Sequence, residues 1–136
     1  MISINKLNNI IRIRRDVEEL MKKLKGFIDE NDVEGKMEAV CNADRIKFMC
    51  MPNGCVVHVL DNDKARYSII IDNSELTIID WNSKTMKNPN NDDEVNMILR
   101  ELGAEKDMEE CINKYILGKE VLLSKLKAVM LLLNIL

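Results

Sequence analysis

The side chains from which a metal site would first be built are the four cysteines and the single histidine of the chain. Cys41, Cys50, Cys55 and His58 are separated by eight, four and two residues, whereas zinc sites ordinarily use a tight knuckle with two residues between cysteines. Along strands these side chains would also point to alternating faces. We therefore predict no metal, no other cofactor and four buried free thiols, because cytosolic cysteines are ordinarily reduced.

His58 is the single side chain suited to acid–base catalysis near neutral pH. Its neighbours in the sequence are Val56, Val57, Val59 and Leu60, and no Gly-x-Ser-x-Gly motif or comparable nucleophile elbow is present. A catalytic histidine needs a nucleophile and an orienting acid within reach, and the sequence places neither beside it. The sequence therefore predicts a protein that is not an enzyme.

Two acidic clusters are better explained by local structure than by chemistry. Residues 61–63 (Asp-Asn-Asp) begin like a calcium loop, but Ala65 and Arg66 stand where a fifth ligand and an invariant glycine are required. Residues 92–94 (Asp-Asp-Glu) suit the N-terminus of a helix, where negative side chains meet the positive end of the helix dipole. We predict a turn and a helix start.

Arginine and aromatic side chains are the best candidates for ligand binding. No glycine-rich phosphate loop of either common kind is present, so guanidinium groups would have to bind an anion. We predict a cleft between subunits for a small anionic, nucleotide-like ligand, lined by Arg45, Arg66, Tyr67 and Trp81. The N-terminal arginines are a further source of positive charge for such a ligand.

Charge is unevenly distributed along a chain whose net charge is −3. Residues 1–28 hold seven basic and three acidic side chains, and residues 29–95 hold seven and fourteen. A basic arm for an anionic partner would give this asymmetry, as would the basic helix of one subunit lying on the acidic surface of another. Nucleic acid is the less favoured partner, because aromatic residues are 4% of the chain and the basic residues are spread around the helix. Those residues are Arg12, Arg14, Arg15, Lys22, Lys23 and Lys25.

Residues 3–28 have the pattern of one long amphipathic helix within an N-terminal segment 1–31, and Ser3 is its expected N-cap. Apolar residues recur with alternating gaps of three and four, which is the seam of a coiled coil. A helix of this length would span roughly 39 Å, which is longer than a domain of this size is wide. We therefore expect it to project or to pack on another subunit. The seam residues are Ile10, Ile13, Val17, Leu20, Leu24 and Phe27.

Residues 36–81 predict an antiparallel meander of four or five short strands, joined by turns of two to four residues. The strongest hairpin signal is residues 52–54 (Pro-Asn-Gly). Both faces of the central hairpin are largely apolar, so helices of one chain are expected to cover one face and a second subunit the other. Residues 82–91 are polar and contain a proline, and they predict a linker.

Residues 92–136 predict a C-terminal helical segment and complete a single α+β domain. One helix is expected from Asp92 to Gly103, and a second from a capping box at Asp107 and Glu110, with Gly118 ending or kinking it. The last eighteen residues contain twelve apolar ones, and a helix of this kind has to be buried, here inside an oligomer. The predicted oligomer interface is Leu20, Leu24, Leu126, Val129, Leu133 and Leu136.

The expected function is that of a non-enzymatic, oligomeric binding protein, a homodimer or larger. The build is typical of proteins encoded by phages or mobile elements, which occlude a host protein, including host defence proteins, or sequester a small nucleotide-like ligand. The alternative is a dimeric nucleic-acid-binding regulator that uses the basic N-terminal helix. The first residues lack the layout of a signal peptide. The longest apolar run, residues 128–133, is far short of the roughly 20 needed to cross a bilayer, so we expect a cytoplasmic protein.

Overall fold

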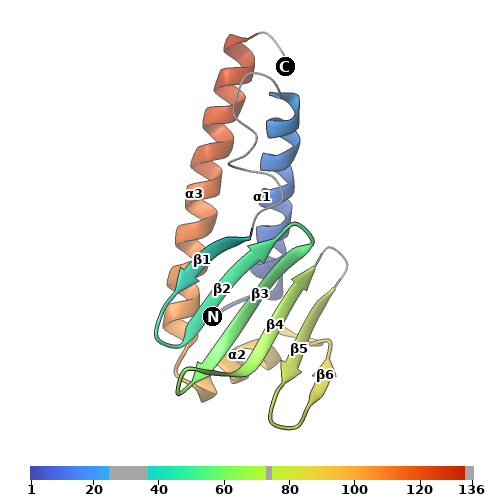
Figure 1. The fold of residues 1–136 in the computed structure, drawn as a ribbon, viewed down its shortest axis with the longest axis vertical. Helices are drawn as coiled ribbons and strands as arrows, with labels where there is room; N and C mark the ends of the chain where they lie inside the picture. The colour runs from blue at the N-terminus through green and yellow to red at the C-terminus, as the bar shows by residue number, and fades with distance from the viewer. Residues whose placement is uncertain (25–36, 73–74, 134–136) are drawn as a thin grey trace.

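The computed structural model describes residues 1–24, 37–72 and 75–133 and has the predicted α+β architecture. Within these residues an N-terminal helix is followed by an antiparallel sheet and two C-terminal helices (Figure 1). The helices are α1 (Ile4–Lys23), α2 (Asp92–Glu101) and α3 (Glu105–Leu132). The strands are β1 (Glu38–Asn42), β2 (Ile46–Met51), β3 (Gly54–Asp61), β4 (Lys64–Asp72), β5 (Leu76–Asp80) and β6 (Thr85–Lys87).

The sheet has six strands in the order of the chain, whereas the sequence predicts four or five. The additional strand, β6, lies inside the segment that the sequence predicts to be a linker, and it pairs with β5 through Ile78 with Lys87 and Ile79 with Met86. All three of its residues are exposed. A short edge strand of this kind has no apolar alternation by which a sequence could reveal it.

The turns between the central strands follow the predicted chemistry. Residues 52–53 connect β2 to β3, and a Cβ on Gly54 would lie 2.5 Å from the carbonyl oxygen of Ile71, so only glycine fits there. Asn62 and Asp63 connect β3 to β4 with φ values of 50° and 66°, which are those of a type I′ hairpin turn. The cluster at residues 61–63 therefore forms the predicted turn.

All three helices lie on one face of the sheet, and the main core is between the two layers (Figure 1). Alternate sheet residues, including Phe48, Val57 and Ile69, are fully or almost fully buried there. The start of α1 is fixed by Asn96 of α2, which is itself fully buried. Its side-chain oxygen accepts from the Ile2 amide at 2.9 Å and its nitrogen donates to the Ile2 carbonyl at 2.7 Å.

Helices α1 and α3 run side by side in the same direction and extend beyond the sheet (Figure 1). A second apolar cluster joins them there. α1 begins after the predicted N-cap Ser3, whose hydroxyl accepts from the Lys6 amide, and it ends at Lys23 with Leu24 as C-cap. The prediction that this helix continues to residue 28 concerns residues outside the described ones. The cluster consists of Val17, Leu20, Met21, Leu24, Leu126 and Met130.

The predicted interface residues are therefore partly covered within one chain. Leu20, Leu24 and Leu126 are buried between α1 and α3, while Val129 and Leu133 are 38% and 42% exposed. Leu136 lies outside the described residues. The structure is of a single chain, so the oligomer itself stays a prediction.

The C-terminal segment differs from its prediction in one respect: α3 is one helix of 28 residues from Glu105. It begins without a side-chain cap at Ala104, so the predicted capping box at Asp107 does not start it. Gly118 lies in the middle of the helix rather than at its end. A central glycine costs a helix about 1 kcal/mol, and the packing of Leu126 and its neighbours against α1 offsets that cost. α2 ends as predicted, because Gly103 follows it with a φ of 65°.

The four cysteines form two disulfides, so the prediction of free thiols is wrong. Cys50 and Cys55 are directly opposite each other on β2 and β3. Cys41 of β1 is bonded to Cys111 of α3, 70 residues further along the chain. The hairpin register and the packing of β1 on α3 bring these pairs together, and spacing in the sequence reveals neither. The expectation rested on the inferred compartment and not on geometry.

We predict that the Cys41–Cys111 disulfide stabilises the oxidised protein more than the Cys50–Cys55 disulfide does. Closing a loop of 70 residues removes more entropy from the unfolded chain, about 4 kcal/mol against about 2 kcal/mol for the short loop. Urea unfolding of Cys41→Ser/Cys111→Ser and of Cys50→Ser/Cys55→Ser, each compared with the parent, measures the difference. Adding a reductant should abolish the difference in unfolding free energy between the parent and Cys41→Ser/Cys111→Ser. Equal losses in the two variants would contradict the prediction.

Candidate functional site

The four predicted ligand residues lie at one end of the sheet, where β2 and β4 begin and β3 and β5 end. Three of them are tied into local contacts. Arg66 Nη1 is 2.5 Å from Asp80 Oδ1, and its guanidinium lies 4.2 Å from the centre of the Tyr67 ring. The Tyr67 hydroxyl donates to Glu101 Oε2 at 2.6 Å. Burial and the bond to Glu101 raise the pKa of Tyr67 to about 12.

These residues do not converge on one cleft. Tyr67 and Asp80 line a cavity of about 570 Å³ between the sheet and α2, and neither Arg45 nor Trp81 is among its lining residues. Arg66 is neutralised by Asp80, whose pKa is lowered because amide and guanidinium hydrogen bonds outweigh the effect of desolvation. The contacts at this end therefore hold the strand ends together, and they leave no guanidinium pair aimed at an anion.

His58 belongs to a hydrogen-bonded network on the other face of the sheet. Its Nδ1 is 2.7 Å from Ser68 Oγ, and Trp81 Nε1 donates to the same oxygen at 2.7 Å. Because Ser68 Oγ accepts from Trp81, its own proton is available to donate to His58 Nδ1. Burial and then the charge of Lys47 lower the pKa of His58, so its ring is neutral at pH 7.

A histidine hydrogen-bonded to a serine is a feature of nucleophilic catalysis. The sequence did not reveal this pair, because His58 and Ser68 are on different strands. Ser68 is 1% exposed and its oxygen is engaged by two neighbours. Among the described residues no carboxylate forms a hydrogen bond with the His58 ring. The network therefore fixes the Trp81 indole on the sheet and does not form a triad.

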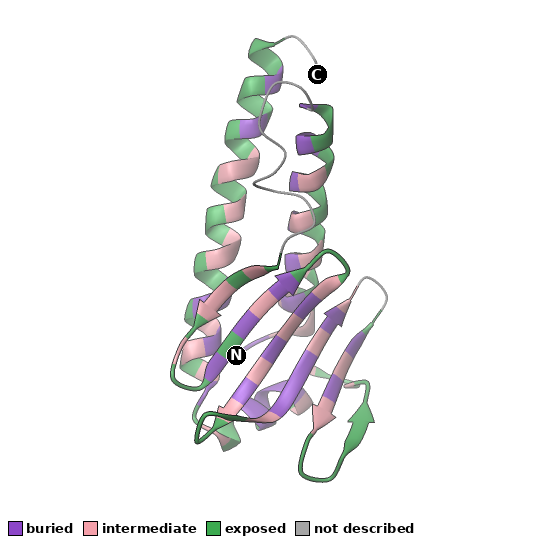
Figure 2. Cartoon of the chain, viewed as in Figure 1, coloured by how far each residue is buried: buried purple, intermediate pink, exposed green. Residues whose placement is uncertain are grey.

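The sheet face opposite the helices is covered by no described element, and we call it the open sheet face. Two cross-strand rows make up its centre, one from Met49 to Thr77 and one from Lys47 to Met86. Figure 2 shows this face as intermediate and exposed stripes that alternate with the buried ones. It consists of Lys47, Met49, Met51, Val56, His58, Ser68, Ile70, Thr77, Ile79, Trp81 and Met86.

The composition of the open sheet face departs from that of an ordinary exposed sheet. Outward positions of antiparallel sheets are ordinarily polar, but here most are aliphatic or methionine, and Lys47 is the charged member of the set. Trp81 is 47% exposed and Met86 is 69% exposed. Tryptophan and methionine are enriched in protein interfaces. The apolar residues on both sides of the β2–β3 hairpin already indicated such a face in the sequence.

A polar cluster holds β1 against both long helices. Glu38 accepts from Arg14 at 2.6 Å, from the Tyr115 hydroxyl at 3.0 Å and from Lys119, whose Nζ is 2.9 Å away. Burial would raise the pKa of Glu38, but the bonds from Lys119 and Arg14 outweigh it and lower the pKa. Arg14 is thus engaged inside the chain, and the basic residues of α1 do not form a single stripe for nucleic acid.

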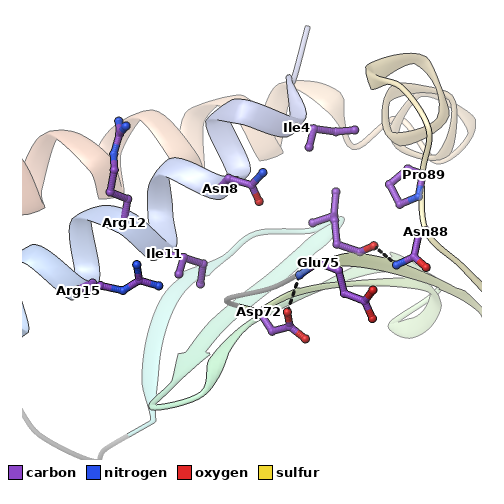
Figure 3. Close-up of a pocket in the computed structure, with 10 residues that line it drawn as sticks. Ile4, Asn8, Ile11, Arg12, Arg15, Asp72, Glu75, Asn88 and Pro89 are labelled. Carbon is purple, nitrogen blue, oxygen red and sulfur yellow. Dashed lines mark hydrogen bonds between the residues drawn. The ribbon is translucent and has the colours of Figure 1, made fainter.

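A second cavity, of about 520 Å³, lies between α1 and one end of strands β4 and β5 (Figure 3). Asn8, Arg12 and Arg15 line it from α1, and Asp72 and Glu75 line it from the ends of β4 and β5. In Figure 3 the Arg15 side chain extends towards Ile11, whereas the Arg12 side chain points away from the sheet. Arg15 and Asp72 each take part in another interaction in the chain. The N-terminal arginines thus line a cavity at the opposite end of β4 from Arg66 and Tyr67.

Metal ligands and membrane-spanning segments are absent from the described part of the chain. No three His, Cys, Asp or Glu side chains gather there closely enough to hold a metal ion. Among the same residues, no helix has the length and apolar character needed to cross a membrane. Comparison of the chain with models of known protein families, with curated proteins and with solved structures gave no match.

We predict that His58 makes the protein less stable as the pH falls from about 7.5 to about 5.5. Its pKa is lowered in the folded state, so the unfolded chain binds more protons once the pH falls below the ordinary histidine value of about 6.5. Since His58 is the single histidine, His58→Gln should flatten the profile over this range. Glu38 and Asp80, whose pKa values are lowered, affect stability only at more acidic pH.

Urea unfolding of the parent and of His58→Gln at both pH values measures this. Lys47→Gln is a control that removes the lysine charge but leaves the His58 ring buried. Its pH dependence should lie between those of the parent and His58→Gln. A His58→Gln protein with the same pH dependence as the parent would contradict the assignment.

Proposed function

We propose that the protein is a non-enzymatic binding protein that occludes a partner protein through its open sheet face. The observation that carries the proposal is an apolar sheet face, with an exposed tryptophan and exposed methionines, which no described element covers. The largest exposed apolar patch of a single protein chain, ordinarily about 300–600 Å², is often an interaction site. The protein would thus belong to the class that the sequence predicts, a binding protein, and the open sheet face would be its binding surface.

The size of the face favours reversible binding over a permanent contact between two such faces. Its two rows span β2 to β6, and strand spacing and rise per residue give roughly 20 Å by 15 Å, or about 300 Å² of flat area. A stable dimer interface buries about 800 Å² on each partner. A partner that contacts this face and its polar rim would reach the lower range of transient complexes.

Charge specifies the partner further. Lys47 is charged and His58 is neutral at pH 7, so the two central rows of the face carry one positive charge among apolar side chains. A second copy would bring another Lys47 into the same interface. A partner with an apolar surface and a carboxylate opposite Lys47 satisfies both features, because a buried lysine without a partner is costly.

The test is selection of binders from a displayed library of random linear peptides against the oxidised protein. Selected peptides should combine apolar residues with Asp or Glu, and their binding should shift the fluorescence of Trp81, the single tryptophan. Met49→Glu on the open sheet face should weaken binding at least about tenfold, because it buries a carboxylate in an apolar contact. Selection against Lys47→Glu should enrich basic peptides instead of acidic ones.

Met97→Glu is the matched control, because Met97 is 65% exposed on α2, in the helical layer. It should leave peptide affinity unchanged. Peptides that bind Met49→Glu as tightly as the parent, or that lose affinity with Met97→Glu instead, would overturn the proposal.

The cavity beside α1 supports a second candidate, the binding of a small anionic, nucleotide-like ligand. Asn8, Arg12 and Arg15 of α1 line one wall of the cavity and two carboxylates line the other, so a ligand with an anionic end and hydroxyl groups would meet both walls. Arg12 is exposed, and its side chain, which points away from the sheet in Figure 3, would rotate towards such an anion.

Calorimetric titration with adenosine monophosphate and with adenosine tests this candidate. The phosphate should increase affinity in the parent, and Arg12→Ala should reduce binding of the monophosphate about tenfold, the typical effect of losing a hydrogen bond to a charged group. Binding of adenosine should not change. Arg45→Ala, at the other end of the sheet, is the control, and a loss there with none in Arg12→Ala would place the ligand at the end that the sequence predicted. Failure of both ligands to bind would overturn this candidate alone.

A further inference from the structure

The outer side of α3 carries an apolar seam that is exposed and that no described helix or strand covers. Leu117, Val121, Ser124, Ala128 and Leu131 follow one another with gaps of four, three, four and three. All five are exposed, and Leu117 and Leu131 are 62% and 63% exposed. Leucine at such exposure, repeated with heptad spacing, is the pattern of a helix that pairs with another helix.

This seam lies on the opposite side of α3 from the contact with α1. Successive residues of a helix are rotated by about 100°, which places Ile112, Leu126 and Met130 on one side and the seam roughly 180° from them. The buried and intermediate bands of α3 face α1 in Figure 2, and the exposed bands face away. The seam is therefore distinct from the one that the sequence assigned to the oligomer, of which Leu20, Leu24 and Leu126 are buried within the chain.

We infer that this seam pairs with the same seam of a second copy, in a parallel two-helix arrangement. With Leu117 and Leu131 at the d positions of the heptad, Val121 and Ala128 occupy the a positions, and a β-branched residue at a with leucine at d favours two strands. Ser124 is the small central layer. The occupant is thus a second copy of this chain, and the open sheet faces remain free.

Charges beside the seam support both the occupant and its direction. In the parallel arrangement Glu120, at a g position, lies opposite Lys125, at an e position of the second copy, and symmetry forms this pair twice. On its own helix neither residue has a charged neighbour three or four positions away. Neither forms an ion pair with any described residue. An antiparallel arrangement would instead bring Lys125 against Lys125 of the second copy.

Sedimentation of the full chain over a range of concentrations tests the inference. The parent should reach twice its 15.7 kDa mass, and Val121→Glu should weaken association at least about 100-fold, because it places two carboxylates in one apolar layer. Val121 is 48% exposed in the single chain, so the melting temperature of the monomer should not fall. Val129→Glu, on the same helix but off the seam, is the matched control and should still associate.

Charge reversal tests the direction without disturbing the apolar seam. Glu120→Lys and Lys125→Glu should each weaken association about three- to tenfold, and the double reversal should restore it. Lys125→Gln should also weaken association, because it removes the cation opposite Glu120. Tighter association of Lys125→Gln would mean the antiparallel arrangement, in which the change removes a pair of like charges, and would overturn the parallel one. A parent that stays monomeric at all concentrations, or a dimer lost with Val129→Glu and kept with Val121→Glu, would overturn the seam itself.

Discussion

Burial of the inner face of the sheet is the constraint on which the other elements depend. Ile46, Phe48, Val57, Ile69 and Ile78 form an apolar surface, and an antiparallel sheet with such a face is stable in water only when helices cover it. The first turns of α1, all of α2 and the first half of α3 provide that cover. What remains of α1 and α3 extends past the sheet and has to find its own packing, which explains why the two helices meet in a second cluster.

The position of the helices on the sheet determines which surfaces are available for binding. Since all three helices are on one face, the opposite face has no cover from any described residue, and its apolar row of Met49, Val56 and Ile70 faces outward. Since one side of α3 packs on α1, its other side is free to contact a second copy. The proposed partner surface and the proposed dimer seam are therefore separate, so one molecule could use both at once.

The polar and covalent contacts at the ends and edges of the sheet stabilise the fold. Glu38 joins β1 to α1 and α3, Arg66 with Asp80 joins β4 to β5, and Cys41 with Cys111 crosslinks β1 to α3. Each ties an edge or an end of the sheet to a neighbour, where backbone pairing is weakest. Arg14 and Arg66 were candidate anion ligands in the sequence, but they form ion pairs with Glu38 and Asp80 instead. Positive charge in a sequence is thus a poor guide to an anion site unless the carboxylates around it are known.

Local patterns in the sequence were sufficient for the class of the fold, the α1 cap at Ser3, the hairpin turn before Gly54 and the turn at residues 62–63, because each depends on residues close together in the chain. The apolar outer face of the β2–β3 hairpin was also visible in the alternation of its residues. Tertiary structure alone decided the rest. Strand register placed Cys50 against Cys55 and His58 beside Ser68, and packing brought Cys41 to Cys111 across 70 residues. It also decided which side of α3 is buried, because an apolar helix with two usable seams does not specify from its own sequence which one faces the chain.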